Sequence, residues 1–204
     1  MELRELLRPT PVVPVLTLED PEQAVPVACA LAAGGLTVVE VTLRTPTAME
    51  SIRRIAREVS GVVVGAGTVT RAAELEAVRR AGARFAVTPG LTPALVDAAL
   101  DADLPLLPGV MTPSEALAAR DRGITTLKLF PAAAAGGVAL LRALHSPLPE
   151  LVFCPTGGID AGSFRDYLAL PNVLCVGGSW VAPKQAVAAG DWGRITQLAR
   201  EASS

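Results

Sequence analysis

The sequence is organised by eight short apolar segments, rich in valine and leucine, that recur at even spacing along the chain. Most of these segments show no clean alternation of apolar and polar residues. Continuous apolar runs of this length are typical of strands that are covered on both faces, as in parallel sheets. The repeat therefore predicts buried parallel strands at 12–16, 37–43, 62–68, 84–90, 104–110, 125–130, 151–158 and 173–179.

Helical patterns fill the stretches between these segments. In 46–59 one helical face carries the apolar residues, and most charged residues fall elsewhere; the apolar residues are Met49, Ile52, Ile55, Ala56 and Val59. Several helix starts are marked by a capping side chain directly before a proline, which suits the first helical position. On this basis we predict helix starts at Asp20-Pro21, Thr45-Pro46, Thr92-Pro93 and Thr112-Pro113.

Eight strands that alternate with helices, in a chain without a linker, are compatible with a closed (β/α)8 barrel or an open doubly wound sheet. The chain has 204 residues, which is small but sufficient for a barrel. An open sheet usually carries a glycine-rich nucleotide fingerprint after its first strand, whereas "TLEDPEQA" follows the first segment here. We therefore expect an α/β fold of the TIM-barrel type in one compact domain over 1–204, with 1–10 as a short N-terminal helical segment.

Composition excludes several classes of partner. The net charge is −2 and no basic block stands out, so we expect no nucleic-acid partner. No apolar run approaches the roughly 18 residues of a membrane helix, and "MELRELLRPT" has no signal-peptide core. We therefore expect a cytoplasmic protein with no membrane partner.

Cysteine and histidine are too sparse for a metal site of the usual kinds. Cys29, Cys154 and Cys175 are widely spaced in apolar surroundings and fit no zinc pattern, so we expect three buried free thiols. His145 is the single histidine of the chain, which excludes a metal site built on several histidines. We expect no metal ion and no cofactor.

The stretch "TTLKLFPA" (125–132) places Lys128 inside an apolar run. Side chains alternate along a strand, so Lys128 and Phe130 share one side while the neighbouring leucines take the side that suits the helices. We therefore expect Lys128 to face the barrel interior. Burial disfavours the charged form of a lysine, and the neutral amine is a nucleophile. The alternatives are a lysine that pairs with a buried carboxylate and a lysine that binds phosphate.

Glu40 is the carboxylate that matches this lysine. Alternation places Val38, Glu40 and Thr42 on one side of their strand, so Glu40 also faces inward. A carboxylate and an amine on separate strands of one barrel can lie close enough to exchange protons, which would give a general acid/base beside a nucleophile. A mutually neutralising ion pair is the alternative, and the sequence leaves both readings open.

Arg44 follows on the same side of that strand, at the rim of the predicted barrel. An arginine there suits bidentate recognition of a substrate carboxylate, although a surface ion pair is the usual role of an isolated arginine. Thr68 ends the segment 62–68 and offers a hydroxyl to the same site. Equally, Thr68 would serve as a cap for the next helix.

Two glycine-rich turns follow the last two predicted strands, as "TGG" (156–158) and "GGS" (177–179). Barrels often bind phosphate with backbone N–H groups of the loops in these two places. The alternative is a pair of tight turns that need positive φ angles. Two such turns in these positions favour a phosphate site.

Seven motifs, taken in order, resemble the bacterial class I aldolases of 2-keto-3-deoxy-6-phosphogluconate (KDPG) and 4-hydroxy-2-oxoglutarate (KHG). The resemblance runs from about Pro11 to Arg200 and is specific to this family rather than to barrels in general. The motifs are "VVEVTLRT" (38–45), "VGAGTV" (64–69), "FAVTPGL" (85–91), "LPGVMTPSE" (107–115), "LKLFPA" (127–132), "FCPTGGI" (153–159) and "CVGGSWV" (175–181).

The resemblance implies a homotrimer of (β/α)8 barrels that needs no metal. It implies that Lys128 forms a Schiff base with a phosphorylated keto-acid substrate and that Glu40 is the general acid/base. Arg44 and Thr68 would hold the pyruvyl carboxylate. The activity implied is cleavage of KDPG to pyruvate and glyceraldehyde 3-phosphate in the Entner–Doudoroff pathway, and KHG is a plausible second substrate.

The same resemblance assigns the rest of the site. Phe130 would pack against the substrate, and Thr156 would lie by its hydroxyl groups, which favours the gluconate-derived substrate. Ala133 stands where family members often have an acidic residue, a departure that affects only local detail. The phosphate would lie near Gly157, Gly158, Gly178 and Ser179.

Two other classes of barrel would share the glycine turns. A phosphosugar isomerase or epimerase would usually add metal ligands or a carboxylate pair, and the single histidine argues against the metal-dependent versions. A non-catalytic phosphosugar-binding barrel would have no need for Lys128. Turnover, as opposed to tight binding alone, distinguishes the aldolase from the binding protein.

Overall fold

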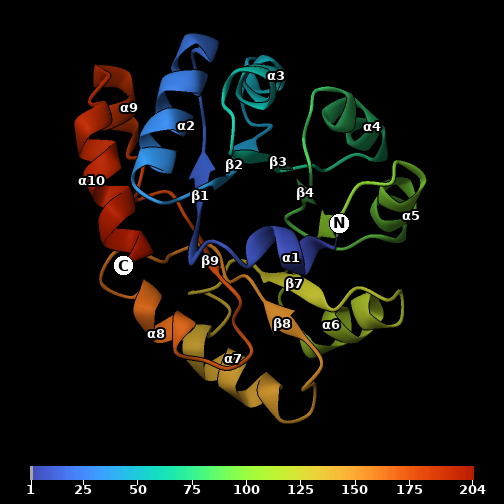
Figure 1. Cartoon of the computed structure of the whole chain (residues 1–204). Coiled ribbons are helices and arrows are strands. Elements are labelled where there is room, and N and C mark those ends of the chain that lie inside the picture. The colour runs from blue at the N-terminus through green and yellow to red at the C-terminus, as the bar shows by residue number, and fades with distance from the viewer. Residues whose placement is uncertain (1) are drawn as a thin grey trace.

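The structure, a computed structural model, describes residues 2–204 as parallel strands surrounded by helices (Figure 1). The strands are β1 (Val12–Leu16), β2 (Val38–Thr42), β3 (Val63–Gly67), β4 (Ala86–Val87), β5 (Leu106–Leu107), β6 (Gly109–Val110), β7 (Thr126–Leu129), β8 (Val152–Phe153) and β9 (Val176–Gly178). The helices are α1 (Leu3–Leu7), the 3-10 turn η1 (Pro21–Gln23), α2 (Ala24–Ala33), α3 (Ala48–Glu58), α4 (Ala72–Arg80), α5 (Pro93–Asp101), α6 (Pro113–Arg120), α7 (Gly137–His145), α8 (Phe164–Leu168), α9 (Lys184–Ala189) and α10 (Trp192–Ser203).

The strands pair in parallel and form two ladders. One sheet has the order β5-β4-β3-β2-β1-β9 and the other has the order β6-β7-β8. The segment 104–110 supplies two strands that are separated by a single residue. The first, β5, pairs with β4, and the second, β6, pairs with β7. Pro108 separates them and has no N–H group to donate to a ladder. The predicted α/β class with parallel strands is confirmed, and each predicted strand segment contains at least one strand.

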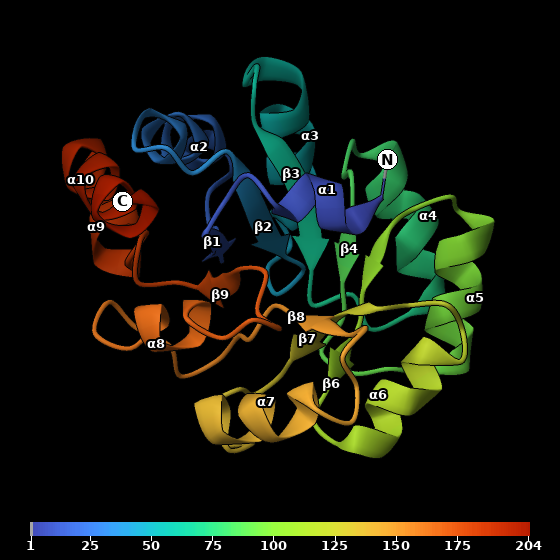
Figure 2. The same ribbon diagram turned by 60° about the horizontal axis from the view of Figure 1, so that its bottom comes forward.

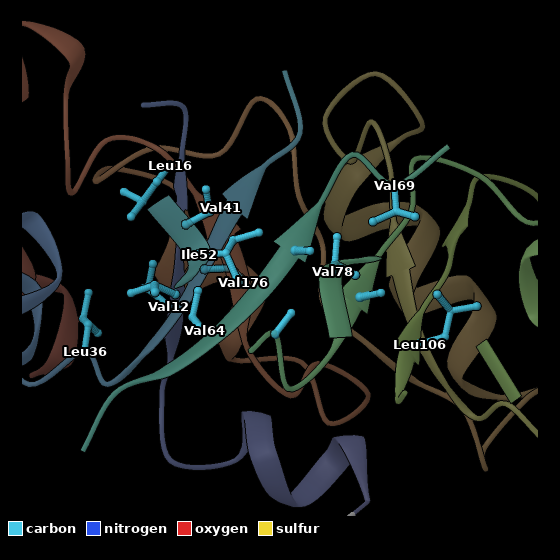
Figure 3. Close-up of a cluster of buried hydrophobic side chains, with 14 of the residues drawn as sticks. Val12, Leu16, Leu36, Val41, Ile52, Val64, Val69, Val78, Leu106 and Val176 are labelled. Atoms are coloured by element: carbon cyan, nitrogen blue, oxygen red, sulfur yellow. The ribbon is translucent and has the colours of Figure 1, made fainter. Parts of the chain in front are cut away.

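Two clusters of buried apolar side chains lie on opposite sides of the strands. The larger cluster joins strand residues such as Val41 and Val64 to helix residues such as Ile52 and Val78 (Figure 3). The smaller, inner cluster joins strand residues to α1 and contains Leu3, Leu6, Leu7, Val13, Val38, Phe85, Val87, Leu107, Cys154 and Cys175. The strands therefore bury side chains on both faces, as their continuous apolar runs predict.

Helix α1 lies inside the ring formed by the other helices (Figure 1) and against the strands (Figure 2). Its three buried leucines, Leu3, Leu6 and Leu7, follow the helical i, i+3, i+4 spacing and pack on the inner cluster. Between residues 2 and 204, no helix is both long enough and apolar enough to cross a membrane.

The predicted helix starts differ in outcome. Thr92 and Thr112 cap α5 and α6, each accepting a backbone N–H on its side chain, and Pro93 and Pro113 occupy the first turns, as predicted. Asp20 caps the 3-10 turn η1 rather than an α-helix. The start predicted at Thr45-Pro46 is wrong, because α3 begins at Ala48. Instead, the Thr45 hydroxyl donates to the carbonyl of Leu18 and ties the β2–α3 loop to the segment after β1.

The three cysteines are free, but they are not alike. Cys154 and Cys175 are buried as predicted, and the hydrogen bond with Cys154, together with burial, raises the pKa of the Cys175 thiol. The prediction for Cys29 is wrong, because this residue is exposed on α2. Its neighbours on α2 are apolar around most of the helix, so the sequence did not indicate which side faces solvent.

Candidate active site

Strands β7 and β2 bring Lys128 and Glu40 together. Their side chains are 6% and 4% exposed, and Nζ of Lys128 lies 3.8 Å from Oε1 of Glu40. The apolar neighbours Leu127 and Leu129 belong to the larger cluster, between strands and helices, so the lysine points to the other side of β7. Nζ also lies 5.0 Å from the centroid of the Phe130 ring, close enough for a cation–π contact. The buried pair combines an amine with a carboxylate that can accept or return a proton.

Glycine residues on β3 make room for the Glu40 carboxylate. In the β2–β3 ladder, Glu40 pairs with Gly65 and Thr42 pairs with Gly67. A Cβ atom added to Gly67 would collide with the carboxylate of Glu40, and one added to Gly65 would collide with the ring of Phe85. The glycines of "VGAGT" therefore act as spacers, a role that their sequence pattern alone did not assign.

Arg44 and Thr68 meet at the rim, beyond the ends of β2 and β3. The Nε atom of Arg44 donates a hydrogen bond of 3.0 Å to Oγ1 of Thr68. Thr68 has a φ angle of 57°, a left-handed conformation that is rare for a β-branched residue and costs on the order of 1–3 kcal/mol. Strain of this kind is concentrated at functional sites, and here it aims the Thr68 hydroxyl at the arginine.

A cavity of about 620 Å³ opens at this end of the strands. Residues that follow β1, β2, β7, β8 and β9 line it, so it lies at the carboxyl ends of the strands, where α/β folds of this kind bind their ligands. Six of the predicted site residues are among the lining: Arg44, Phe130, Thr156, Gly157, Gly178 and Ser179.

Four predicted residues do not line this cavity. Thr68 adjoins it through its hydrogen bond to Arg44, and Lys128 adjoins it through the Phe130 ring. Glu40 lies next to Lys128. Gly158 has a φ angle of 76° and packs so closely on Ala133 that an added Cβ would lie 2.6 Å from its methyl group. Gly158 therefore has a clear structural role in the turn, whatever its part in phosphate binding.

The loops after β7 and β8 are held together by backbone hydrogen bonds. The N–H groups of Ala132 and Ala133 donate to the carbonyl groups of Thr156 and Gly157, at 2.8 and 3.0 Å. Thr156 in turn forms a parallel bridge with Gly177, whose missing side chain leaves space for the threonine. These backbone hydrogen bonds hold the two loops, and with them the lining of the cavity, in a fixed arrangement.

The cavity also has lining residues that were not assigned from the sequence: Thr17, Glu19, Trp180 and Lys184. Trp180 lies within the motif "CVGGSWV"; its ring packs on Gly178 and lies 5.6 Å, centroid to centroid, from the Phe164 ring at a tilt of 39°. Thr17 shares a hydrogen bond of 2.9 Å with Thr42. For Lys184 a signal was available, because the sequence contains just two lysines. Across residues 2–204 no cluster of three or more potential metal ligands is found.

Comparison with known proteins decides the family. The family model described as KDPG and KHG aldolase matches residues 3–198. The chain belongs to the KDPG and KHG aldolase family. The "KHG/KDPG aldolase" of Escherichia coli is 52% identical over 197 residues, which cover 97% of this chain and 92% of that protein. The "2-dehydro-3-deoxy-phosphogluconate aldolase" of Pseudoalteromonas atlantica is 52% identical over 192 residues, which cover 94% and 89%.

Solved structures of this aldolase family share the fold. A KDPG aldolase from Legionella pneumophila superposes with a TM-score of 0.97 at 42% identity and covers 100% of this chain and 99% of its own. That crystal structure contains pyruvate captured at low pH as a covalent carbinolamine intermediate. The KDPG aldolase of Zymomonas mobilis, solved with 3-phosphoglycerate, gives a TM-score of 0.93 at 46% identity, covering 98% of this chain and 94% of its own.

Proposed function

We propose that this member of the KDPG and KHG aldolase family is a class I aldolase, a lyase that cleaves KDPG to pyruvate and glyceraldehyde 3-phosphate. The observation that carries the proposal is the buried amine of Lys128 beside the Glu40 carboxylate, 3.8 Å away and next to the cavity. The covalent carbinolamine in the Legionella relative is the adduct expected when an amine attacks the ketone of pyruvate.

The reaction begins when the neutral amine of Lys128 attacks the C2 ketone of the substrate. Loss of water from the carbinolamine gives an iminium ion. Glu40 removes the proton of the C4 hydroxyl, and the electrons of the C3–C4 bond flow into the iminium as that bond breaks. Glyceraldehyde 3-phosphate leaves, the enamine is protonated at C3, and hydrolysis releases pyruvate and frees Lys128.

The remaining residues would orient the substrate. Arg44 supplies a planar pair of donors for the carboxylate next to C2, and its hydrogen bond to Thr68 fixes its direction. Phe130 would pack on the pyruvyl part, because its ring already lies by the amine. Thr156 would contact the hydroxyl groups. The backbone N–H groups around Gly157, Gly158, Gly178 and Ser179 would receive the phosphate.

Trapping with borohydride tests this mechanism. Incubation with pyruvate and borohydride should leave a stable adduct on Lys128, which peptide mass spectrometry would locate. The assignment is unambiguous, because Lys184 carries the one other lysine amine of the sequence. Lys128→Arg keeps the charge but should abolish both the adduct and cleavage. An adduct on Lys184 with Lys128 unmodified would reject the mechanism.

A second substrate is proposed on the name of one relative. The Escherichia coli protein, at 52% identity, is named as an aldolase of both KHG and KDPG. KHG shares the pyruvyl half of KDPG, so the same residues would release pyruvate and glyoxylate. KHG has no phosphate, so comparing kcat/KM for the two substrates would measure how much the glycine turns contribute to binding.

We also infer that the two ladders form one closed (β/α)8 barrel, as a single domain. Three observations support closure: the bridge of Thr156, just after β8, to Gly177 of β9, the single residue between β5 and β6, and an inner cluster with residues from both sheets. A homotrimer remains a prediction of the family resemblance, and sedimentation equilibrium would test it. The cytoplasmic location remains a prediction from the sequence composition.

A further inference from the structure

Three charged side chains are among those that line the cavity: Glu19, Arg44 and Lys184. Arg44 is engaged with Thr68 and lies on the side proposed for the substrate carboxylate. Glu19 and Lys184 form no ion pair with any residue in the described range 2–204. Lys184 is therefore a cation at the cavity that has no ion-pair partner among the residues that the structure describes.

Lys184 lies close in the chain to the second glycine turn. A tight turn follows β9, in which the N–H of Ala182 donates to the carbonyl of Ser179. Pro183 then leads into α9, whose first residue is Lys184. Gly178, Ser179 and Lys184 all line the same cavity, so the amine and part of the proposed phosphate site border one space.

The proposed phosphate site needs a positive charge that the glycine turns do not supply. A phosphate monoester carries about −1.5 to −2 charges at pH 7. The N–H groups of the glycine turns are neutral donors and supply no net charge, while Glu19 adds a further negative charge to the lining. A flexible ammonium group is a suitable point charge for a phosphate, whereas the planar guanidinium of arginine suits fixed bidentate contacts.

The choice of residue supports the same conclusion. The chain contains two lysines and uses arginine at every other cationic side-chain position apart from its single histidine. One lysine is the buried amine beside Glu40, and the other is exposed at the cavity. A general preference for lysine on the surface does not explain Lys184.

We propose that Lys184 determines specificity for the phosphorylated substrate by pairing its ammonium group with the substrate phosphate. The proposal rests on the proposed function, because it needs a substrate whose keto end is at Lys128. Lys184 takes no part in bond breaking. It makes the same contact before and during the reaction, so it contributes to KM and leaves kcat unchanged.

The test compares KDPG with the same keto acid lacking its phosphate. For Lys184→Gln we expect KM for KDPG to rise about tenfold, the effect of losing a charge-assisted hydrogen bond in a partly solvated site. We expect kcat on KDPG, and all constants for the phosphate-free acid, to stay within about twofold. Lys184→Arg, which keeps the charge, should recover most of the loss. The wild-type KM should also rise more steeply with salt than that of Lys184→Gln.

Arg194→Gln is the matched control, because it removes one exposed positive charge outside the cavity lining. It should leave KM for both substrates unchanged. Equal losses on both substrates for Lys184→Gln, or an unchanged KM for KDPG, would overturn the role of Lys184. A wild-type enzyme that cleaves neither substrate, or that gives no pyruvate adduct on Lys128, would instead reject the proposed function.

Discussion

Cavities of similar size lie at the two ends of the strands, and they differ in what lines them. The cavity at the carboxyl ends measures about 620 Å³ and adjoins Lys128 and Glu40. The other measures about 590 Å³ and is lined by α1, by α5 and by residues at the starts of β5 and β7. Volume therefore does not distinguish a site from a surface hollow in this fold.

The difference lies in where each end keeps its charges. At the amino ends, Arg4 and Glu5 on α1 and Arg8 directly after it are exposed, while the buried face of that helix is leucine. At the carboxyl ends, an amine and a carboxylate are buried together. The desolvation of a buried ion pair can cost more than the pairing returns, so the carboxyl end is the one that gives up stability for chemistry.

The largest effect at the carboxyl end is expected for Glu40→Gln, which keeps the size of the side chain and removes its acid/base function. We expect kcat to fall about thousandfold, or about 4 kcal/mol in the barrier. Steady-state cleavage of KDPG measures it, with the exposed Glu58→Gln as a control that should have no effect. A nearly normal kcat would make Glu40 a counter-ion to Lys128 and no proton carrier.

At the opposite end, Leu7→Ala should lower stability and spare catalysis. Leu7 is fully buried between α1 and the strands, so its loss should cost about 3 kcal/mol in the free energy of unfolding. Urea denaturation measures the loss, and kcat measured well below the melting temperature should be unchanged. A fall in kcat of the folded variant would mean that the two ends are coupled.

Gly67→Ala tests the spacer role on β3. An added methyl group collides with the Glu40 carboxylate and must displace it from Lys128. We expect kcat to fall about 30-fold, or about 2 kcal/mol, because small errors of position in a reacting pair are costly. Gly90→Ala is the matched control, since a methyl group there meets no atom within 4 Å. Equal kcat values for the two variants would contradict the spacer role.

The smallest effect is expected at the amino-end cavity itself. Leu100 lines it and is 65% exposed. Leu100→Ser should change the free energy of unfolding by less than about 0.5 kcal/mol and leave KM for KDPG unaltered. A rise in KM on this substitution would show that the second cavity takes part in the reaction.

The site residues on strands could be predicted from the sequence, whereas Trp180 and Lys184, which follow β9, could not. Strand alternation was enough to place Lys128 and Glu40 on the same side of their strands, because the period of two fixes direction. The 3.8 Å separation was not accessible, since it depends on the register of strands far apart in the chain. Trp180 lies in the turn after β9 and Lys184 begins the helix that follows, and no strand periodicity fixes the direction of either side chain.

In the fold, too, some features could be predicted from the sequence and others could not. The strand segments were accessible because continuous apolar runs are a local signal, and their cores match the observed strands. The break at Pro108 and the exposure of Cys29 were not accessible, because each depends on which neighbour packs against it. The Thr45-Pro46 start failed because the Thr45 hydroxyl bonds to Leu18, a contact between distant segments.

The left-handed backbone of Thr68 has a consequence for laboratory evolution of this enzyme. Glycine adopts that conformation without strain, so replacement of Thr68 by glycine relieves the strain but also removes the hydroxyl that holds Arg44. A selection for heat resistance alone would favour glycine at this position, and a selection for growth on the substrate would favour threonine. Position 68 is therefore the site of a trade-off between thermal stability and activity.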